Sequence, residues 1–149
     1  MADRVSVALT LGGAITDDQY QEVTALIQLE GLSIEWGGAP FEPGHRTRGE
    51  PLKLFAHEVA WGRVEPVEDW CVANRVPFAR WSGGYAGSWG SERVVYAGAG
   101  EPASFVADEE DRILVDRETA LQLGSIEAVI GHFDAADFPI PPLVVDGDP

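Results

Sequence analysis

The sequence predicts an α+β domain in which two strand–helix–strand units share one sheet. Three observations predict it: apolar residues alternate over 4–11, a capped amphipathic helix follows directly, and a second strand, helix and strand occupy 52–81. Such units are typical of a ferredoxin-like or related split sheet, and right-handed crossovers would place both helices on one face. An added β-hairpin and a C-terminal helix complete the single domain that we expect over residues 1–149, with residues 146–149 frayed.

The first unit is predicted over residues 4–36. Its strand shows the two-residue alternation of a half-buried strand, with one apolar face formed by Val5, Val7, Leu9 and Leu11. Thr16 and Gln19 have the spacing of a capping box, in which each side chain accepts a hydrogen bond from the backbone of the other residue. The helix that follows should end at Gly31, and Leu32 to Trp36 is predicted as a short strand.

The second unit is predicted to start with a strand from Leu52 to Val59, both faces of which are partly apolar. Glu65 and Pro66 should open its helix, because proline is tolerated in the first turn, where its missing N–H donor is not needed. Pro77 prevents that helix from continuing. A strand is expected over 78–81, and the Ser-Gly-Gly that follows it ends the unit.

Downstream, residues 93–97 are predicted as a strand, and residues 104–115 as a hairpin around an acidic four-residue turn. Ser125 is a helix cap, and the segment after it carries an apolar stripe at i, i+3, i+4 and i+7, formed by Ile126, Val129, Ile130 and Phe133. A single helical turn is expected over 119–123.

The net charge of −15 is the strongest global signal, because ten Lys and Arg face 25 Asp and Glu. Residues 101–149 alone carry 12 acids and two bases. Such acidity disfavours direct binding to nucleic acid and to anionic membranes, and favours a basic protein surface as partner. The alternative is that the acidity only keeps the protein soluble. With one cysteine and no signal-peptide pattern, we expect a cytoplasmic protein.

The Gly- and aromatic-rich stretch over 77–96 is the densest candidate for a binding loop. Tyr85 and Trp89 would be presented to a partner, since Trp, Tyr and Arg dominate the energetics of interfaces. The alternatives are that the rings fold back on the sheet, or that they stack on a sugar or a base. Gly84, Gly87 and Gly90 resemble a phosphate loop only weakly, because no Lys-Ser or Lys-Thr follows them.

The chain shows no constellation typical of an enzyme. No His, Cys or carboxylate spacing indicates a metal site, and Cys71 falls on the apolar side of a predicted helix, where thiols are usually inert. We therefore expect no catalytic residue, no metal and no cofactor, and we lean against an enzyme. The alternative is a small-molecule-binding or catalytic pocket at the Gly/Trp-rich loop, formed by His57, Arg80, Trp81 and Arg93.

The leading hypothesis is a non-enzymatic acidic interaction protein. It would act as an inhibitor or decoy, of the anti-restriction, anti-CRISPR or immunity type, by occupying a basic surface of a nucleic-acid-binding protein. The expected partner-binding residues are Asp108, Glu109, Glu110, Asp111, Asp116, Tyr85 and Trp89. The acids at 108–111 have a simpler reading as a solvated hairpin tip, and a homo-oligomer is a further alternative.

Overall fold

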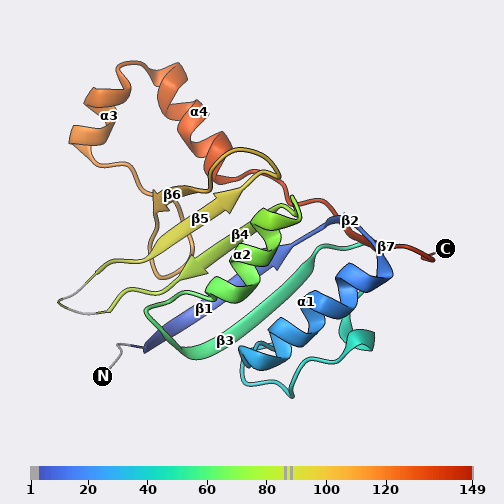
Figure 1. Cartoon of the computed structure of the whole chain (residues 1–149). Helices are drawn as coiled ribbons and strands as arrows, with labels where there is room; N and C mark the ends of the chain where they lie inside the picture. Colours follow the sequence, from blue (N-terminus) through green and yellow to red (C-terminus); the bar gives the residue numbers. More distant parts are fainter. Residues whose placement is uncertain (1–3, 86, 88, 149) are drawn as a thin grey trace.

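A computed structural model describes residues 4–85, 87 and 89–148 and confirms the α+β class. Within these residues the chain forms four α-helices, a five-stranded antiparallel sheet and a two-stranded parallel sheet (Figure 1). None of the helices in this part of the chain is long and apolar enough to cross a membrane.

The five strands of the main sheet lie in the order β3-β1-β4-β5-β6, and each is antiparallel to its neighbours. Their bounds are β1 (Arg4–Leu11), β3 (Leu52–Ala60), β4 (Phe78–Ser82), β5 (Glu92–Tyr96) and β6 (Ala103–Val106). Because β3 and β4 are both antiparallel to β1, they run in the same direction. The helix α2 (Glu65–Ala73) connects them, so β1 splits this strand–helix–strand unit.

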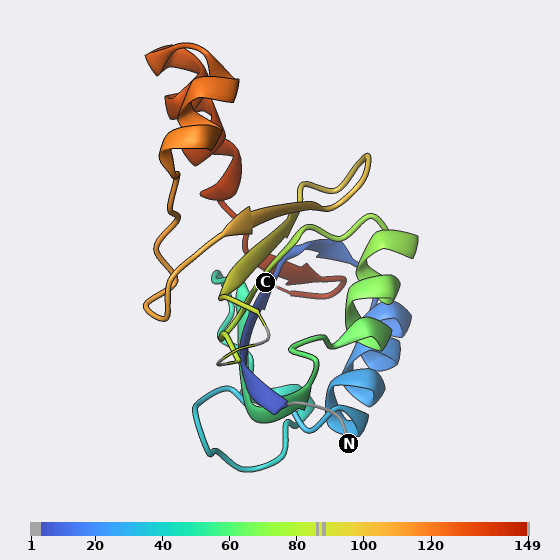
Figure 2. The ribbon, with the colours of Figure 1, turned by 90° about the vertical axis from the view of Figure 1, so that its left-hand side faces the viewer.

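Two helices, α1 (Asp17–Leu29) and α2, lie side by side on one face of the sheet (Figure 2). The predicted capping box starts α1: the Gln19 N–H donates to Thr16 Oγ1 at 3.1 Å, and the Thr16 N–H donates to Gln19 Oε1 at 2.8 Å. The main core lies between these helices and the sheet. Its largest fully buried side chains include Leu9, Leu11, Ile27, Phe41, Leu54 and Phe78.

The strand predicted from Leu32 to Trp36 is wrong. Only Ser33 pairs, through an isolated bridge in which it exchanges backbone hydrogen bonds of 2.9 and 2.7 Å with Phe55 of β3. The chain then turns at 35–38 and runs as a loop with one short 3-10 turn (Pro43–His45) before β3. Ile34 and Trp36 therefore remain exposed, and the Trp36 ring packs 4.9 Å from that of Phe55.

A β-bulge changes which residues of β3 face the core. Val5 pairs with Val59 and Val7 with Ala56, so two residues of β3 stand opposite Ser6. One of these two, Glu58, has a φ of 55°, which is the left-handed conformation found at such bulges. Unbroken alternation would place Glu58 on the face of Leu52, Leu54 and Ala56, whereas the extra residue places Val59 there, buried in the main core.

The C-terminal segment returns to the start of the chain. The strand β7 (Leu143–Val145) pairs in parallel with β2 (Gly13–Ile15), and the Asp146 N–H donates to the Ile15 carbonyl at 3.0 Å. Of residues 146–149, for which the sequence predicts fraying, Pro149 lies outside the described residues, and Asp148 forms an ion pair with Arg46. Asp148 also accepts a hydrogen bond from the Val145 N–H at 3.0 Å.

Acid should loosen this C-terminal contact. The hydrogen bonds from Arg46 and from the Val145 N–H hold the pKa of Asp148 below its ordinary value. A carboxyl whose pKa is lowered by folding stabilises fully above its unfolded pKa of about 3.9, and this contribution is lost as pH falls through the folded value. We expect the NMR amide signals of Ile15 and Val145 to shift progressively below about pH 4. In Asp148→Asn, the part of these shifts that comes from protonation of Asp148 should vanish. Identical titration curves for the two proteins would contradict the role given to Asp148.

Candidate interaction surface

The loop between β4 and β5 brings Tyr85 and Trp89 together, as the sequence analysis pairs them. The two residues exchange backbone hydrogen bonds of 2.9 and 3.1 Å, and their rings stack with centroids 5.4 Å apart. The ring of Trp89 also lies 5.9 Å from that of Trp61, which belongs to the turn after β3. The result is a cluster of three aromatic rings beside the Gly-rich loop.

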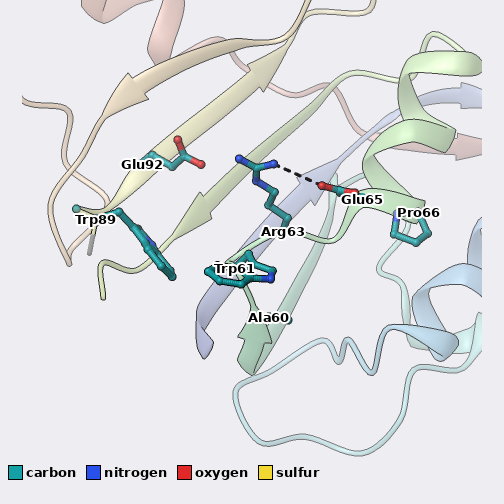
Figure 3. A pocket seen from close by; sticks show the side chains of 8 residues that line it. Ala60, Trp61, Arg63, Glu65, Pro66, Trp89 and Glu92 are labelled. Carbon is teal, nitrogen blue, oxygen red and sulfur yellow. Dashed lines mark ion pairs between the residues drawn. The ribbon is translucent and has the colours of Figure 1, made fainter. Parts of the chain in front are cut away.

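A pocket of about 570 Å³ adjoins this cluster (Figure 3). Trp61 and Trp89 line it together with Ala60, Arg63, Glu65, Pro66, Gly90 and Glu92. The side chains of Arg63 and Glu65 form an ion pair of 3.5 Å at its rim. Glu92 extends from β5 on the other side of the opening, where its carboxylate lies 3.4 Å from Arg80.

Trp61 was missed by sequence reasoning because it lies in a tight turn. Trp61 and Gly62 have φ of 59° and 65°, and the Arg63 N–H donates to the Ala60 carbonyl at 3.4 Å. Two successive positive φ angles are the pattern of a type I′ turn, in which Asn-Gly is the preferred pair. A bulky ring at the first of these positions costs conformational energy, and 55% of the Trp61 residue surface is exposed. Neither turn preference nor burial explains this tryptophan.

The acidic turn over 108–111 is attached to the sheet. Asp108 accepts hydrogen bonds from the backbone N–H groups of Glu110 and Arg112, which lower its pKa, together with the ion pair it makes with the Arg112 guanidinium. Glu109 accepts from the Gly84 N–H at 2.9 Å and from Ser91 Oγ at 2.8 Å. These carboxylates therefore hold the turn against the Gly-rich loop, and the predicted hairpin is reduced to one bridge between Ala107 and Ile113.

Arg93 ties the same turn to the C-terminal helix. Its guanidinium donates to Asp111 Oδ1 at 2.9 Å, to Asp137 Oδ1 at 2.7 Å and to the Ala136 carbonyl at 2.9 Å. Partial burial raises the pKa of Asp111, against the opposing effect of the Arg93 guanidinium. Glu109 and Glu110 are the two exposed acids of the turn, and Glu110 pairs with Arg112 at 3.2 Å.

The four residues of the alternative pocket do not converge. Arg80 lies on the helix-covered face of the sheet, with 3% of its surface exposed, and Trp81 and Arg93 pair across β4 and β5 on the opposite face. His57 packs its ring against Trp36 near the β3 edge, with centroids 4.8 Å apart. The pocket that does lie beside the Gly/Trp-rich loop is lined by other side chains.

The helices α3 (Arg117–Leu123) and α4 (Ile126–Ala136) form an arm that projects from the sheet (Figures 1 and 2). Only its base is anchored, because Ala136 and Phe138 pack on Val95 and Phe105 in a second small core. Asp116 and Ser125 cap the two helices by accepting backbone hydrogen bonds of 2.8 and 3.1 Å. The apolar stripe of α4 is half uncovered, because Ile126 and Ile130 are 73% and 54% exposed while Val129 and Phe133 are partly buried. Leu121 of α3 is 71% exposed.

Charge is distributed unevenly between the helices and the rest of the fold. The four helices carry nine acids and one base: Asp17, Asp18, Glu22, Glu65, Glu68, Asp69, Glu118, Glu127 and Asp134 against Arg117. Within the described residues, six of the ten Lys and Arg side chains form ion pairs: Arg46, Arg48, Arg63, Arg80, Arg93 and Arg112. Most of the positive charge is thus paired with carboxylates of the chain itself, while all of the helix acids except Glu68 are exposed.

Cys71 is fully buried in α2, and burial, reinforced by the nearby Glu68 carboxylate, raises the pKa of its thiol far above neutrality. The described part of the chain holds no group of three or more His, Cys, Asp or Glu that could bind a metal ion.

No family model, no curated protein and no solved structure matches this chain.

Proposed function

We propose that this protein is a non-enzymatic acidic interaction protein that occupies a basic surface of a nucleic-acid-binding protein, as an inhibitor or decoy. The observation that carries the proposal is the projecting α3–α4 arm, which combines exposed apolar side chains with carboxylates. A surface that is both apolar and charged suits a partner whose basic side chains surround an apolar contact.

The arm has the features of a contact element rather than of a core element. Leu121, Ile126 and Ile130 are exposed on it, and its acids include Asp116, Glu118, Glu127 and Asp134. The apolar side chains would lose contact with water in a complex and supply affinity. The carboxylates would speed the encounter with a basic surface and make it dependent on ionic strength.

The aromatic end of the sheet is a second contact region in this proposal. Tyr85 and Trp89 lie there beside the acidic turn, in which Glu109 and Glu110 are exposed. Asp108, Glu109 and Asp111 accept hydrogen bonds from other residues of the chain. They therefore act by holding this turn in place more than by touching the partner directly.

The test starts with capture of the partner from the native host, followed by binding of the two purified proteins. We expect a nucleic-acid-binding protein that duplex DNA or RNA displaces from the complex, with affinity that falls steeply as salt rises. Neutralising the arm with Glu118→Gln, Glu127→Gln and Asp134→Asn should weaken binding by about tenfold or more.

The matched control removes the same charge elsewhere, with Asp18→Asn, Glu22→Gln and Glu30→Gln at α1. It changes the net charge equally but leaves the arm intact, so its effect should be much smaller. Equal losses in the two triple variants, or a complex that neither nucleic acid nor salt affects, would contradict the proposal.

The pocket beside Trp61 and Trp89 favours one alternative, a small-molecule-binding or catalytic domain. Its volume of about 570 Å³ lies in the range of ligand sites. A thermal-shift screen against metabolites separates the two functions, because a ligand at 100 times its Kd adds about 2.7 kcal/mol of stability.

A further inference from the structure

We propose that the pocket lined by Trp61 and Trp89 binds a guanidinium group, such as an arginine side chain on the basic partner. The inference deepens the proposed function and rests on it for the source of this cation. Four observations carry it: two indole rings on one pocket wall, two carboxylates at the rim, a tryptophan at an unfavourable backbone position, and an arginine of the chain itself at the opening.

The rings and carboxylates have complementary roles. A cation over the face of an indole is attracted by the negative potential of the ring, and tryptophan is the strongest aromatic partner. Trp61 and Trp89 both line the pocket, with Glu65 and Glu92 at its rim (Figure 3). Together with the adjoining groove along α2, the lining contains four carboxylates (Glu65, Glu68, Asp69 and Glu92) and two arginines (Arg63 and Arg80), so it is net negative.

Arg63 indicates which cation suits the site. Its guanidinium already lies at the rim, 3.5 Å from the Glu65 carboxylate, and Figure 3 shows it extending between Glu65 and Glu92. A planar guanidinium stacks on aromatic faces and forms paired hydrogen bonds with carboxylates better than an ammonium does, so it suits a site that combines indole rings with rim carboxylates. An incoming arginine would share Glu65 with Arg63 and be repelled by it.

The turn position of Trp61 gives the sharpest test. Asparagine fits the first position of a type I′ turn better than tryptophan does, so Trp61→Asn should raise the melting temperature. The same change removes one ring of the pocket. If Trp61→Asn makes the protein more stable and also weakens guanidinium binding, the tryptophan is present for binding and not for stability.

The experiment is an NMR titration of the full chain that follows the indole N–H signals. The probe is the peptide acetyl-Gly-Arg-Gly-amide, and its neutral counterpart contains citrulline in place of arginine. We expect saturable shifts of the Trp61 and Trp89 signals with the arginine peptide and none with the citrulline peptide. A third peptide, with lysine in place of arginine, should give a weaker response. Trp36→Ala is the matched control, because Trp36 is half-exposed but lies outside the pocket lining.

Three variants should change the affinity for the arginine peptide, two by weakening it and one by strengthening it. Trp61→Asn and Glu65→Gln should each weaken peptide binding about two- to fivefold, and Arg63→Ala should tighten it by a similar factor. Equal binding of the citrulline peptide, weaker binding in Arg63→Ala, or no shift of either indole signal would overturn the inference. These results do not depend on the partner, so failure of the proposed function leaves them intact. A partner complex that needs the arm but is unaffected by Trp61→Asn would overturn only the pocket's role.

Discussion

Replacing Arg80 with alanine should destabilise the protein by about 3–5 kcal/mol, the usual cost of removing one member of a buried ion pair. Arg80 Nε donates to Glu68 Oε1 at 2.7 Å, and Nη1 donates to the Gly62 carbonyl at 2.7 Å and to Ser82 Oγ at 2.9 Å. Without the guanidinium, the Glu68 carboxylate is left nearly buried and uncompensated. Urea unfolding should show the loss as a lower midpoint at an unchanged slope.

A second variant separates the missing partner from the missing volume. Glu68 Oε2 also accepts a hydrogen bond from the Val64 N–H at 2.9 Å, which a glutamine oxygen could retain. The double variant Arg80→Met with Glu68→Gln should therefore recover much of the stability lost in Arg80→Ala. Arg117→Ala, in the exposed arm, is the control and should stay within about 0.5 kcal/mol of the parent protein. Equal midpoints for Arg80→Ala and Arg117→Ala would refute the role given to Arg80.

Gly12→Ala should detach the C-terminal strand and lower stability by about 1–3 kcal/mol or more, as overpacking of a close contact does. A Cβ at Gly12 would lie 1.7 Å from the Pro141 carbonyl oxygen and 2.9 Å from its carbon. Both are backbone atoms, so no side-chain rotation relieves the clash. The shift should separate β7 from β2, and hydrogen exchange at Val145 and Ile15 should accelerate more than exchange at Leu9.

Gly131→Ala is the matched control for that substitution. Gly131 lies within α4, and among the described residues a Cβ there meets no atom within 4 Å apart from its chain neighbours and the backbone of its own helix. Alanine is the better helix former, so this change should stabilise by about 0.5–1 kcal/mol. Opposite signs for one added methyl group would identify close backbone contact as the cause. Unchanged β2–β7 protection in Gly12→Ala would contradict the expected displacement.

Local patterns predicted most of the elements correctly because local interactions decide them. Thr16 and Gln19 satisfy the start of α1 within one turn, Ser125 does the same for α4, and the alternation over 4–11 matches a strand with one buried face. Tyr85 and Trp89 do share a cluster, since the loop that carries them is short. Each of these features is determined by residues that are close together in the chain.

The rest depended on contacts that no local pattern encodes. The segment after Leu32 has the composition of a strand, yet β3 occupies the place beside β1. Only Ser33 of that segment pairs, through a single bridge with Phe55 of β3. One extra residue at Glu58 reverses the faces of β3 beyond it. The candidate pocket joins Trp61 and Trp89 from two turns, and no sequence period connects them; an aromatic residue before glycine in a strand-ending turn was the only signal.

The β2–β7 pairing has a consequence for the order of folding during synthesis. Residues 13–15 leave the ribosome well before their partners at 143–145, which follow about 130 positions later. The five strands of the main sheet end at Val106, so they can pair while the arm is still being translated. Ile15 therefore stays without its β-strand partner in the nascent domain until β7 has been synthesised and pairs with β2.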